Sequence, residues 1–308
     1  MKSFIVACCV LVGSSAMAVE GIVAEGETLQ KLGTGMAFTE GPVWLPSTKT
    51  LVFSDIPASK LMQWREGEGV SEFRSSKHPN GNLLDLEGRL LTCQHSGRAV
   101  VRTEKDGTIK VLADNFEGKK LNSPNDLAVK SDGTIWFTDP PWGLRGKPGE
   151  IDGHWVYRLD PDGALTVVTK SLAMPNGIAF SLDEKRLYVA DTGGHPSVKD
   201  PAKRNAPPKI HVFNVTDTNT LSEKIFEIDV WCDGMTMDEK GNLYAGNHDG
   251  IRVFDPEGKE LGLIKVPEKT TNSCFGGEDY KTLFITARKS LYAIKLDVKG
   301  AKPKNAKW

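Results

Sequence analysis

Apolar residues along this chain gather in short runs separated by polar turns. Residues 175–191, PNGIAFSLDEKRLYVAD, are typical: a polar start, an apolar run, a turn at Asp183-Glu184, and a second apolar run that ends on Asp191. Short runs rich in β-branched and aromatic residues, bounded by turn residues, predict β-strands. The segment therefore predicts a β-hairpin with Asn176 at the mouth of its first strand.

The same pattern recurs in five other places. Two copies align without a gap, EGPVWLPSTKTLVFSD from Glu40 and TNSCFGGEDYKTLFITA from Thr271. Three have a turn one residue shorter, NGNLLDLEGRLLTCQ from Asn80, NDLAVKSDGTIWFTD from Asn125 and DGMTMDEKGNLYAGN from Asp233. Their tight turns contain glycine, which supplies the positive φ of a hairpin turn. The chain is therefore predicted to contain a family of six related hairpins.

Further strand-like runs, such as HWVYRLD and GIRVFD, follow each hairpin before the next unit begins. A period near 40 residues with several strands and no helical pattern is typical of propeller blades. We therefore predict an all-β protein, a six-bladed β-propeller with a central metal site. The run GETLQKL, which begins at Gly26, would add an outer strand to the last blade.

The central site is predicted from the first strands of the blades, which line the channel of a propeller. Equivalent positions of the repeat converge there: Glu40, Asn80, Asn125, Asn176, Asp233 and Asn272. Asn and Asp also favour turns, so several of these residues could simply shape the backbone, but Glu has no such preference. Two carboxylates beside amides repel each other unless they are protonated or a cation neutralises them.

These oxygen donors favour a hard cation. Ca²⁺ binds six to eight oxygens, whereas Zn²⁺ prefers His and Cys, which are missing from the six positions. We predict one divalent cation, Ca²⁺ ahead of Zn²⁺, Mn²⁺ or Mg²⁺. A second polar set ends the second strands and could either orient the metal ligands or cap loops: Asp55, Gln94, Asp139, Asp191 and Asn247, with Ala287 in the sixth unit.

The first eighteen residues differ from the rest, with Lys2, an apolar stretch and Ala16-Met17-Ala18. This predicts a signal peptide cleaved near Ala18, a secreted or periplasmic protein, and one propeller domain over residues 19–308. Loss of one Lys and no acid takes the net charge from −1 to −2 without a basic block. We expect no nucleic-acid, membrane or obligate protein partner. Cys93, Cys232 and Cys274 remain, as buried thiols or with one disulfide.

Several motifs follow one another in order: EGPVW, NDLAV with GTIWFTD, PNGIAF, DGMTMDEKGNLY and TNSCFGG. With them the chain resembles, over about residues 38–296, the senescence-marker-protein, gluconolactonase and luciferin-regenerating-enzyme family of six-bladed propellers. The run GNLLDLEGRLLTCQHSGRAVVRTEKDG is similar to the bacterial gluconolactonase branch. A more distant likeness links the chain to squid-type diisopropyl fluorophosphatase.

The resemblance implies a site and an activity. It implies that Glu40, Asn176 and Asp233 hold a divalent metal, that Asn125 contacts metal or substrate, and that Asp233 is the catalytic general base. Animal members carry a substrate-binding Arg two residues before that Asn, where this chain has Ser123. Their preference among sugar lactones therefore does not transfer.

The function expected from these observations is the hydrolysis of sugar lactones by a gluconolactonase-type enzyme. The cation would polarise the lactone carbonyl and activate water, and Asp233 would accept the proton. His95 and His248 follow the second polar set, and His95 is a candidate for substrate binding. The insertions at residues 142–153 and 192–208 should shape the entrance. Two alternatives remain open: a non-catalytic ligand-binding propeller with structural Ca²⁺, and a phosphotriester hydrolase that uses the same site.

Overall fold

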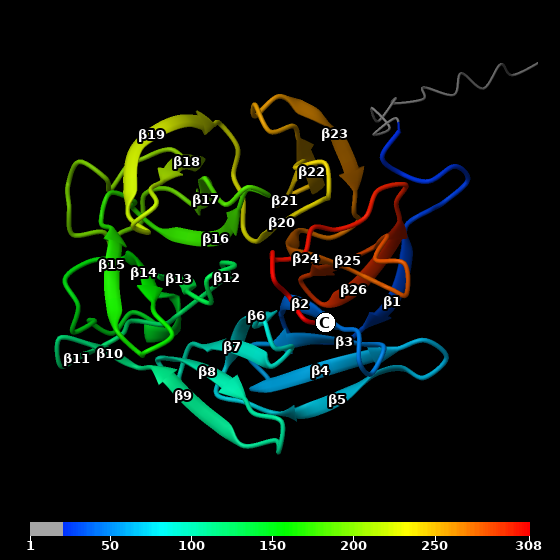
Figure 1. Ribbon diagram of the computed structural model, residues 1–308, viewed down its shortest axis with the longest axis horizontal. Helices are drawn as coiled ribbons and strands as arrows, with labels where there is room; N and C mark the ends of the chain where they lie inside the picture. The colour runs from blue at the N-terminus through cyan, green and yellow to red at the C-terminus, as the bar shows by residue number, and fades with distance from the viewer. Residues whose placement is uncertain (1–20) are drawn as a thin grey trace, which may run out of the picture.

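The structure is a computed structural model that describes residues 21–308, so the predicted leader lies outside the described residues. Six four-stranded antiparallel sheets surround a central axis (Figure 1). The predicted all-β six-bladed propeller is confirmed. Within residues 21–308, no helical segment has the length and hydropathy that a membrane crossing needs.

The blades follow one another in sequence. Blade one contains β2 (Thr39–Leu45), β3 (Thr50–Asp55), β4 (Lys60–Arg65) and β5 (Gly69–Ser75). Blade two contains β6 (Pro79–Leu84), β7 (Leu90–Gln94), β8 (Ala99–Thr103) and β9 (Ile109–Ala113), and a small ribbon, β10 (Asn115–Phe116) with β11 (Lys119–Lys120), follows it. Blade three contains β12 (Leu127–Val129), β13 (Ile135–Asp139), β14 (Trp155–Leu159) and β15 (Leu165–Thr169).

The second half of the ring has the same order of strands. Blade four contains β16 (Pro175–Phe180), β17 (Arg186–Asp191), β18 (Lys209–Val215) and β19 (Leu221–Ile228). Blade five contains β20 (Met235–Met237), β21 (Leu243–Asn247), β22 (Gly250–Phe254) and β23 (Glu260–Lys265). Blade six contains β24 (Thr270–Gly276), β25 (Thr282–Ala287) and β26 (Ser290–Lys295), with β1 (Gln30–Thr34) outermost.

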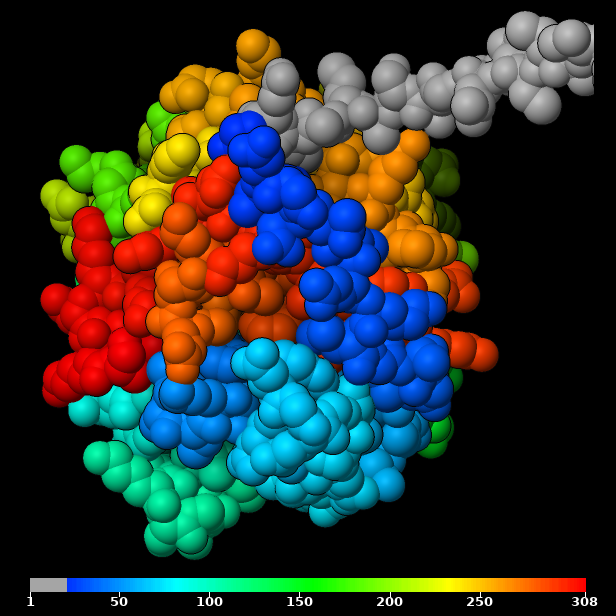
Figure 2. Space-filling model, turned by 90° about the vertical axis from the view of Figure 1, so that its right-hand side faces the viewer, coloured from blue at the N-terminus to red at the C-terminus, as the bar shows by residue number. Residues whose placement is uncertain are grey.

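Both ends of the described chain contribute to blade six and so close the ring. β1 pairs with β26, with Lys31 opposite Tyr292 and Thr34 opposite Ser290. Figure 2 shows this N-terminal segment, in blue, packed across the orange and red residues of the last blade. The outer strand predicted from GETLQKL is thereby confirmed, although it begins only at Gln30 and continues to Thr34.

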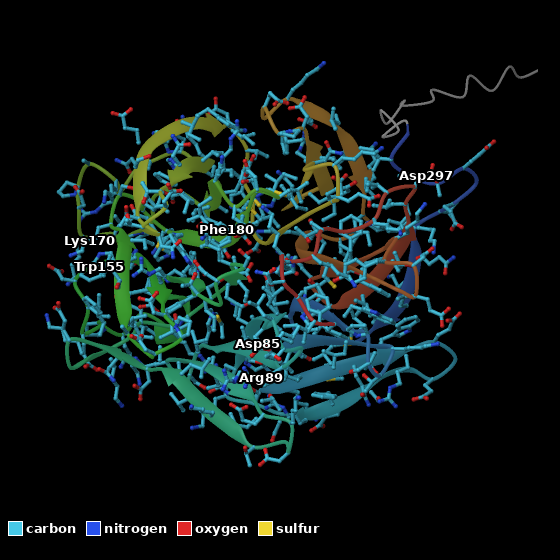
Figure 3. All side chains as sticks on the ribbon, in the orientation of Figure 1. Asp85, Arg89, Trp155, Lys170, Phe180 and Asp297 are labelled. Carbon is cyan, nitrogen blue, oxygen red and sulfur yellow. The ribbon has the colours of Figure 1, made fainter. Side chains whose placement is uncertain are left out.

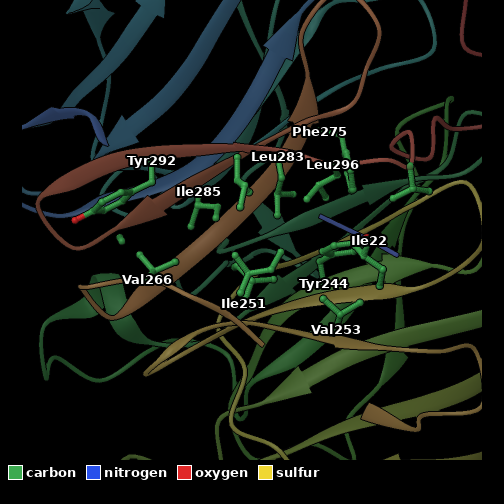
Figure 4. Packing of buried hydrophobic residues seen from close by; sticks show 14 residues of the cluster. Ile22, Tyr244, Ile251, Val253, Val266, Phe275, Leu283, Ile285, Tyr292 and Leu296 are labelled. Atoms are coloured by element: carbon green, nitrogen blue, oxygen red, sulfur yellow. The ribbon is translucent and has the colours of Figure 1, made fainter. Parts of the chain in front are cut away.

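The core is a series of apolar layers between neighbouring blades. Figure 4 shows the layer between blades five and six, where Tyr244 and Ile251 meet Leu283 and Ile285. All six residues of β3 are buried, because both faces of a blade pack against other blades. This explains why the inner strands of the hairpins do not alternate between apolar and polar residues. Full burial of each large aliphatic side chain contributes roughly 1.5–3 kcal/mol.

The cysteines of the described residues are free thiols. Cys93 and Cys232 are buried and Cys274 is half-buried. The structure thus agrees with the prediction of buried thiols for two of them and forms no disulfide within residues 21–308.

Residues 299–308 lie across the end of the channel where the inner strands finish (Figure 1). Ala301 donates its backbone N–H to Met237, and the Asn305 amide donates to the Ser131 carbonyl at 3.0 Å. The indole Nε1 of Trp308 donates to the Asp85 carbonyl at 2.8 Å. The segment therefore connects blade five with blades three and two across this end.

Candidate active site

The six predicted channel residues lie where the inner strands begin, at the opposite end from residues 299–308. In three blades the preceding residue pairs with the last residue of the second strand, as Thr39 does with Asp55 and Pro175 with Asp191, and in blade six Thr270, two residues before Asn272, pairs with Ala287. The register then shifts at once, which is the signature of a β-bulge. A bulge changes the direction in which a side chain points. The bulge at the start of these strands accounts for polar side chains in front of otherwise buried strands.

Contacts across the axis demonstrate that these side chains converge. Asn272 of blade six donates its amide N–H to Asp126 Oδ2 of blade three, on the other side of the ring, at 3.2 Å. Asn176 Nδ2 donates to Asp233 Oδ1 at 2.8 Å between neighbouring blades. Glu40 interacts with both Asp233 and Asn272, so Glu40, Asn176, Asp233 and Asn272 are brought together, while Asn80 and Asn125 stand at the equivalent positions of blades two and three. We call this set the channel ring: Glu40, Asn80, Asn125, Asn176, Asp233 and Asn272.

Glycine follows the channel-ring residue in four of the six units, and packing explains it. A Cβ on Gly177 would lie 2.4 Å from the Asp233 carbonyl oxygen, and one on Gly81 would lie 2.7 Å from the Asn125 carbonyl oxygen. Those same carbonyls accept the N–H groups of the two glycines at 2.9 and 2.8 Å. Only glycine permits the inner strands to approach so closely.

Asp126 follows Asn125 and so occupies the position of these glycines in blade three, where the repeat pattern did not predict a site residue. Its side chain is buried and accepts hydrogen bonds from Leu127 N at 2.9 Å and from Asn272. The sequence signal for Asp126 is that it stands where four of the other repeat units have glycine. The channel therefore contains a third carboxylate, which the repeat alignment alone did not predict.

Burial and mutual repulsion perturb all three carboxyl groups. Burial raises the pKa of Glu40 well above its usual range, and the charges of Asp233 and Asp126 raise it further. Burial raises the pKa of Asp126 to about 7. It also raises the pKa of Asp233 to about 6, although the positive charge of Lys269 and the hydrogen bond from Asn176 oppose that shift. Three carboxylates so close together are costly to ionise without a compensating positive charge.

The donors present fit the predicted cation. Among residues 21–308, no three His, Cys, Asp or Glu side chains form a metal cluster by themselves. Any metal here would therefore also need amide oxygens, such as those of Asn125 and Asn176. Carboxylate and amide oxygens are the ligands that Ca²⁺ prefers, and a divalent cation would offset the repulsion between Glu40 and Asp233.

The second polar set caps loops, which was one of the two predicted alternatives. Asp139 accepts the backbone N–H groups of Asn122 at 2.8 Å and Ser123 at 2.7 Å. Asp191 accepts those of Ala173 and Met174 in the same way. Each capped loop leads into a channel-ring residue two or three positions later. These carboxylates therefore position the ring through the backbone.

His95 reaches the ring through another residue. Its side chain is buried, and Nε2 lies 2.8 Å from Asn80 Nδ2. Burial lowers the pKa of His95 to about 4, so its imidazole is neutral at pH 7. With Asn80 as donor, Nε2 accepts and the proton of His95 resides on Nδ1. His248 is exposed and stacks on Trp231 with ring centroids 4.2 Å apart.

Lys269 is a further group that the sequence analysis missed. Its Nζ lies 3.9 Å from the centroid of the Trp231 ring, and its charge acts on both Asp233 and Glu40. Burial lowers the pKa of Lys269. No position of the repeat marks this residue, because it stands in the loop before β24. It supplies a positive charge beside the carboxylates.

The two long insertions lie over the mouth, as expected. The short 3-10 helix Trp142–Leu144 packs so closely that a Cβ on Gly143 would lie 2.6 Å from that of His95. The N–H of Gly143 donates to Ser123 Oγ at 2.9 Å. Residues of both insertions line a single cavity of about 870 Å³ beside the mouth.

The site lies within a recognised family region. The sequence profile of the SMP-30/Gluconolactonase/LRE-like region matches residues 38–289. The chain belongs to this family. It is 31% identical over 308 residues to a gluconolactonase of Zymomonas mobilis, an alignment that covers 90% of this chain and 83% of that protein. It is 27% identical to pentonolactonase XacC of Haloferax volcanii, over 82% of each chain.

Solved structures agree with this family assignment. A gluconolactonase from Xanthomonas campestris superposes with a TM-score of 0.80 and 34% identity, over 92% of this chain and 93% of that one. Every channel-ring residue lies inside the region matched by the SMP-30/gluconolactonase family, which confirms the resemblance found in the sequence motifs.

Proposed function

We propose that this protein is a metal-dependent lactonase that opens sugar lactones at the channel ring. The observation that carries the proposal is the convergence of Glu40, Asp126 and Asp233 beside amide side chains, with the pKa of each carboxyl raised. Relatives named gluconolactonase, pentonolactonase and lactonohydrolase support hydrolysis of a lactone. The substrate is accordingly a small lactone.

Glu40, Asn176 and Asp233 would hold the cation, with Ca²⁺ favoured by the oxygen donors. Asn125 stands at the equivalent position of blade three and would bind either the cation or a substrate hydroxyl. A bound divalent cation polarises a carbonyl and lowers the pKa of water. The repulsion among the three buried carboxylates supports this assignment, because it is the condition that cation binding would relieve.

Asp233 would serve as the general base. Its Oδ1 accepts the N–H of Asn176 at 2.8 Å, so Oδ2 is the oxygen left to accept a proton from the attacking water. The hydrogen bond fixes the carboxylate in one orientation, which a positioned base requires. The hydrogen bond between Asn80 and His95 would orient the Asn80 side chain toward the bound substrate.

The test is the turnover of glucono-1,5-lactone by Asp233→Asn. We expect a loss on the order of 10²–10⁴-fold, as for removal of a general base. The matched control Asp217→Asn changes an exposed turn residue and should retain full activity. Chelated wild-type protein should lose activity and regain it with Ca²⁺ or another divalent cation.

Different results would identify the alternatives. Unchanged turnover in Asp233→Asn, or indifference to chelation, would contradict the proposed mechanism. Absence of lactone turnover by a folded protein that still binds Ca²⁺ would favour a ligand-binding propeller. Faster hydrolysis of a phosphotriester than of any lactone would favour a phosphotriester hydrolase at the same site.

We also propose that residues 1–18 direct export, with cleavage near Ala18. The charged start, apolar stretch and small residues of this segment support the proposal. Sequencing the N-terminus of protein recovered from the periplasm or medium should identify a chain that begins near Val19. A full-length chain that keeps Met1 and stays in the cytoplasm would contradict it.

A further inference from the structure

The cavity of about 870 Å³ lies between the long connections of two neighbouring blades. One connection joins β13 to β14 and the other joins β17 to β18. Asn122 and Ala173 form part of its inner wall, and each is three residues ahead of a channel-ring residue. Pockets of roughly 300–1,000 Å³ hold drug-sized ligands. The cavity therefore lies next to the loops that lead into the channel ring and is large enough to hold a ligand unit of its own.

The cavity exposes aromatic and polar side chains beside a limited aliphatic surface. Of its aliphatic residues, Ile151, Leu172 and Val198 are each only 4% exposed and belong to the packing behind the wall, whereas Leu144 is partly exposed. Trp142, in contrast, is 38% exposed. The accessible aliphatic surface that could receive an acyl chain is therefore limited to Leu144 and the prolines Pro141 and Pro148. A ring with apolar C–H faces and hydroxyl edges matches flat aromatic surfaces set among hydrogen-bonding groups.

The aromatic side chains are held in place by defined contacts. Trp142 meets His195 edge to face, with centroids 5.2 Å apart, and thereby links the two insertions. Lys170 Nζ lies 4.0 Å from the Trp155 ring centroid, and Figure 3 shows the two residues together at the outer side of blade three. Rigid aromatic groups lose little conformational entropy when they bind a ligand.

Polar groups complete the wall. Lys199 of one insertion and Asp152 of the other form a salt bridge at 2.6 Å. His154 lies with Nδ1 2.8 Å from the Ala173 carbonyl, and its pKa is lowered by burial, so the ring is neutral at pH 7 and Nε2 can accept a hydrogen bond. The cavity thus offers acceptors and donors as well as aromatic faces, which is what hydroxyl-rich ligands require.

We propose that this cavity is a subsite for a second sugar unit, and that the preferred substrates are aldonolactones that carry a glycosyl substituent. The proposal rests on the lactonase function proposed above. The lactone ring would occupy the channel ring while the glycosyl unit lies against Trp142. Binding energy from such a remote unit can be used to orient the reacting ring, so it raises kcat/KM for the larger substrate.

The experiment compares lactobiono-1,5-lactone with glucono-1,5-lactone. We expect the wild-type protein to have the higher kcat/KM with the disaccharide lactone. Trp142→Ala should lower that value about tenfold, equivalent to the loss of one good contact, and change the value for glucono-1,5-lactone by less than about twofold. Phe73→Ala removes an aromatic side chain that is 36% exposed on the outer strand of blade one, and should alter neither value.

Three results would overturn the subsite. They are an equal loss on both lactones in Trp142→Ala, no loss on either, or a wild-type preference for an N-acylhomoserine lactone that depends on Trp142. Calorimetric binding of lactobionate to chelated protein provides a readout that does not require activity, and it should weaken in Trp142→Ala.

This readout also separates the two proposals. Lactobionate binding that depends on Trp142, in a protein that hydrolyses no lactone, would defeat the lactonase function while supporting a sugar-binding cavity. Normal turnover of glucono-1,5-lactone, without any effect of Trp142→Ala on the disaccharide lactone, would defeat the subsite alone.

Discussion

Asp191 and Asp233 are both acidic residues at the mouth of the channel, but their oxygens have different partners. Asp191 accepts backbone N–H groups from Ala173, Met174 and Gly193. The hydrogen-bond partner of the Asp233 carboxylate among the described side chains is a single amide, that of Asn176. The oxygens of Asp191 are occupied by hydrogen bonds from the backbone, whereas Asp233 retains oxygen lone pairs for other partners in the channel.

The difference teaches that position within the hairpin decides what a carboxylate does. Asp55 and Asp191 end regular strands, where the loop that leads into the inner strand of the same blade passes and offers unpaired N–H groups. Channel-ring residues stand at or just before the starts of the inner strands, four of which begin with a bulge. The same residue type thus stabilises the fold at one position and is available for chemistry at the other.

Removing a carboxylate from the channel ring should have the largest effect on activity. Glu40→Gln should lower lactone turnover by about 10²–10⁴-fold, because it removes one charge from the predicted cation site. The thermal midpoint of the chelated variant should equal or exceed that of chelated wild type, because repulsion is relieved. A large fall in the midpoint would place Glu40 with the structural carboxylates.

Removing a loop-capping carboxylate should mainly lower stability. Asp139→Ala leaves the buried N–H groups of Asn122 and Ser123 without an acceptor, at a cost of about 3 kcal/mol. Urea unfolding measures this loss, with Asp217→Ala as the exposed control. A variant that keeps wild-type stability but loses turnover would erase the distinction between the two sets.

Asn176→Ala should have a smaller effect, and on metal affinity. We expect calcium binding to weaken roughly 10–100-fold, since the variant loses a proposed ligand and the group that orients Asp233. The free energy of unfolding should change by less than about 1 kcal/mol. Calorimetric titration with Ca²⁺ and urea unfolding provide the two values. The reverse result would make Asn176 a hairpin residue only.

The smallest expected effect is on the pH dependence of the chelated protein. The pKa of Asp126 rises from 3.8 to about 7 on folding, so between those values the folded state alone retains the proton. Stability therefore falls as pH rises through this window, and no further loss from this group occurs above it. The thermal midpoint should drop by a few degrees between pH 4 and pH 8. Asp126→Asn should flatten this slope, and added Ca²⁺ should offset the drop.

The repeat made the channel ring predictable. Glu40, Asn176 and Asp233 are far apart in sequence, but hairpins that differ in length by at most one residue place equivalent residues at similar depth around one axis. The outer strand from GETLQKL was predictable for a related reason, because a ring with one open edge leaves a strand position for the chain to fill.

The remaining parts of the site depend on contacts that have no periodic signal. Asp126 is one residue out of phase with the ring, and Lys269 belongs to a loop that repeats nowhere else. The cavity beside Trp142 forms only when two unrelated insertions meet in space. Residues that act through tertiary contacts of this kind cannot be located from spacing alone.

Residues 299–308 give the molecule two unlike ends. Because this segment lies across the far opening, we expect ligands to enter and leave at the other end, where the inner strands begin. A spent ligand at the channel ring would then stand in the path of the next one. Product release would then have to precede binding of the next substrate, and the loops around Trp142 and Trp231 would influence both steps.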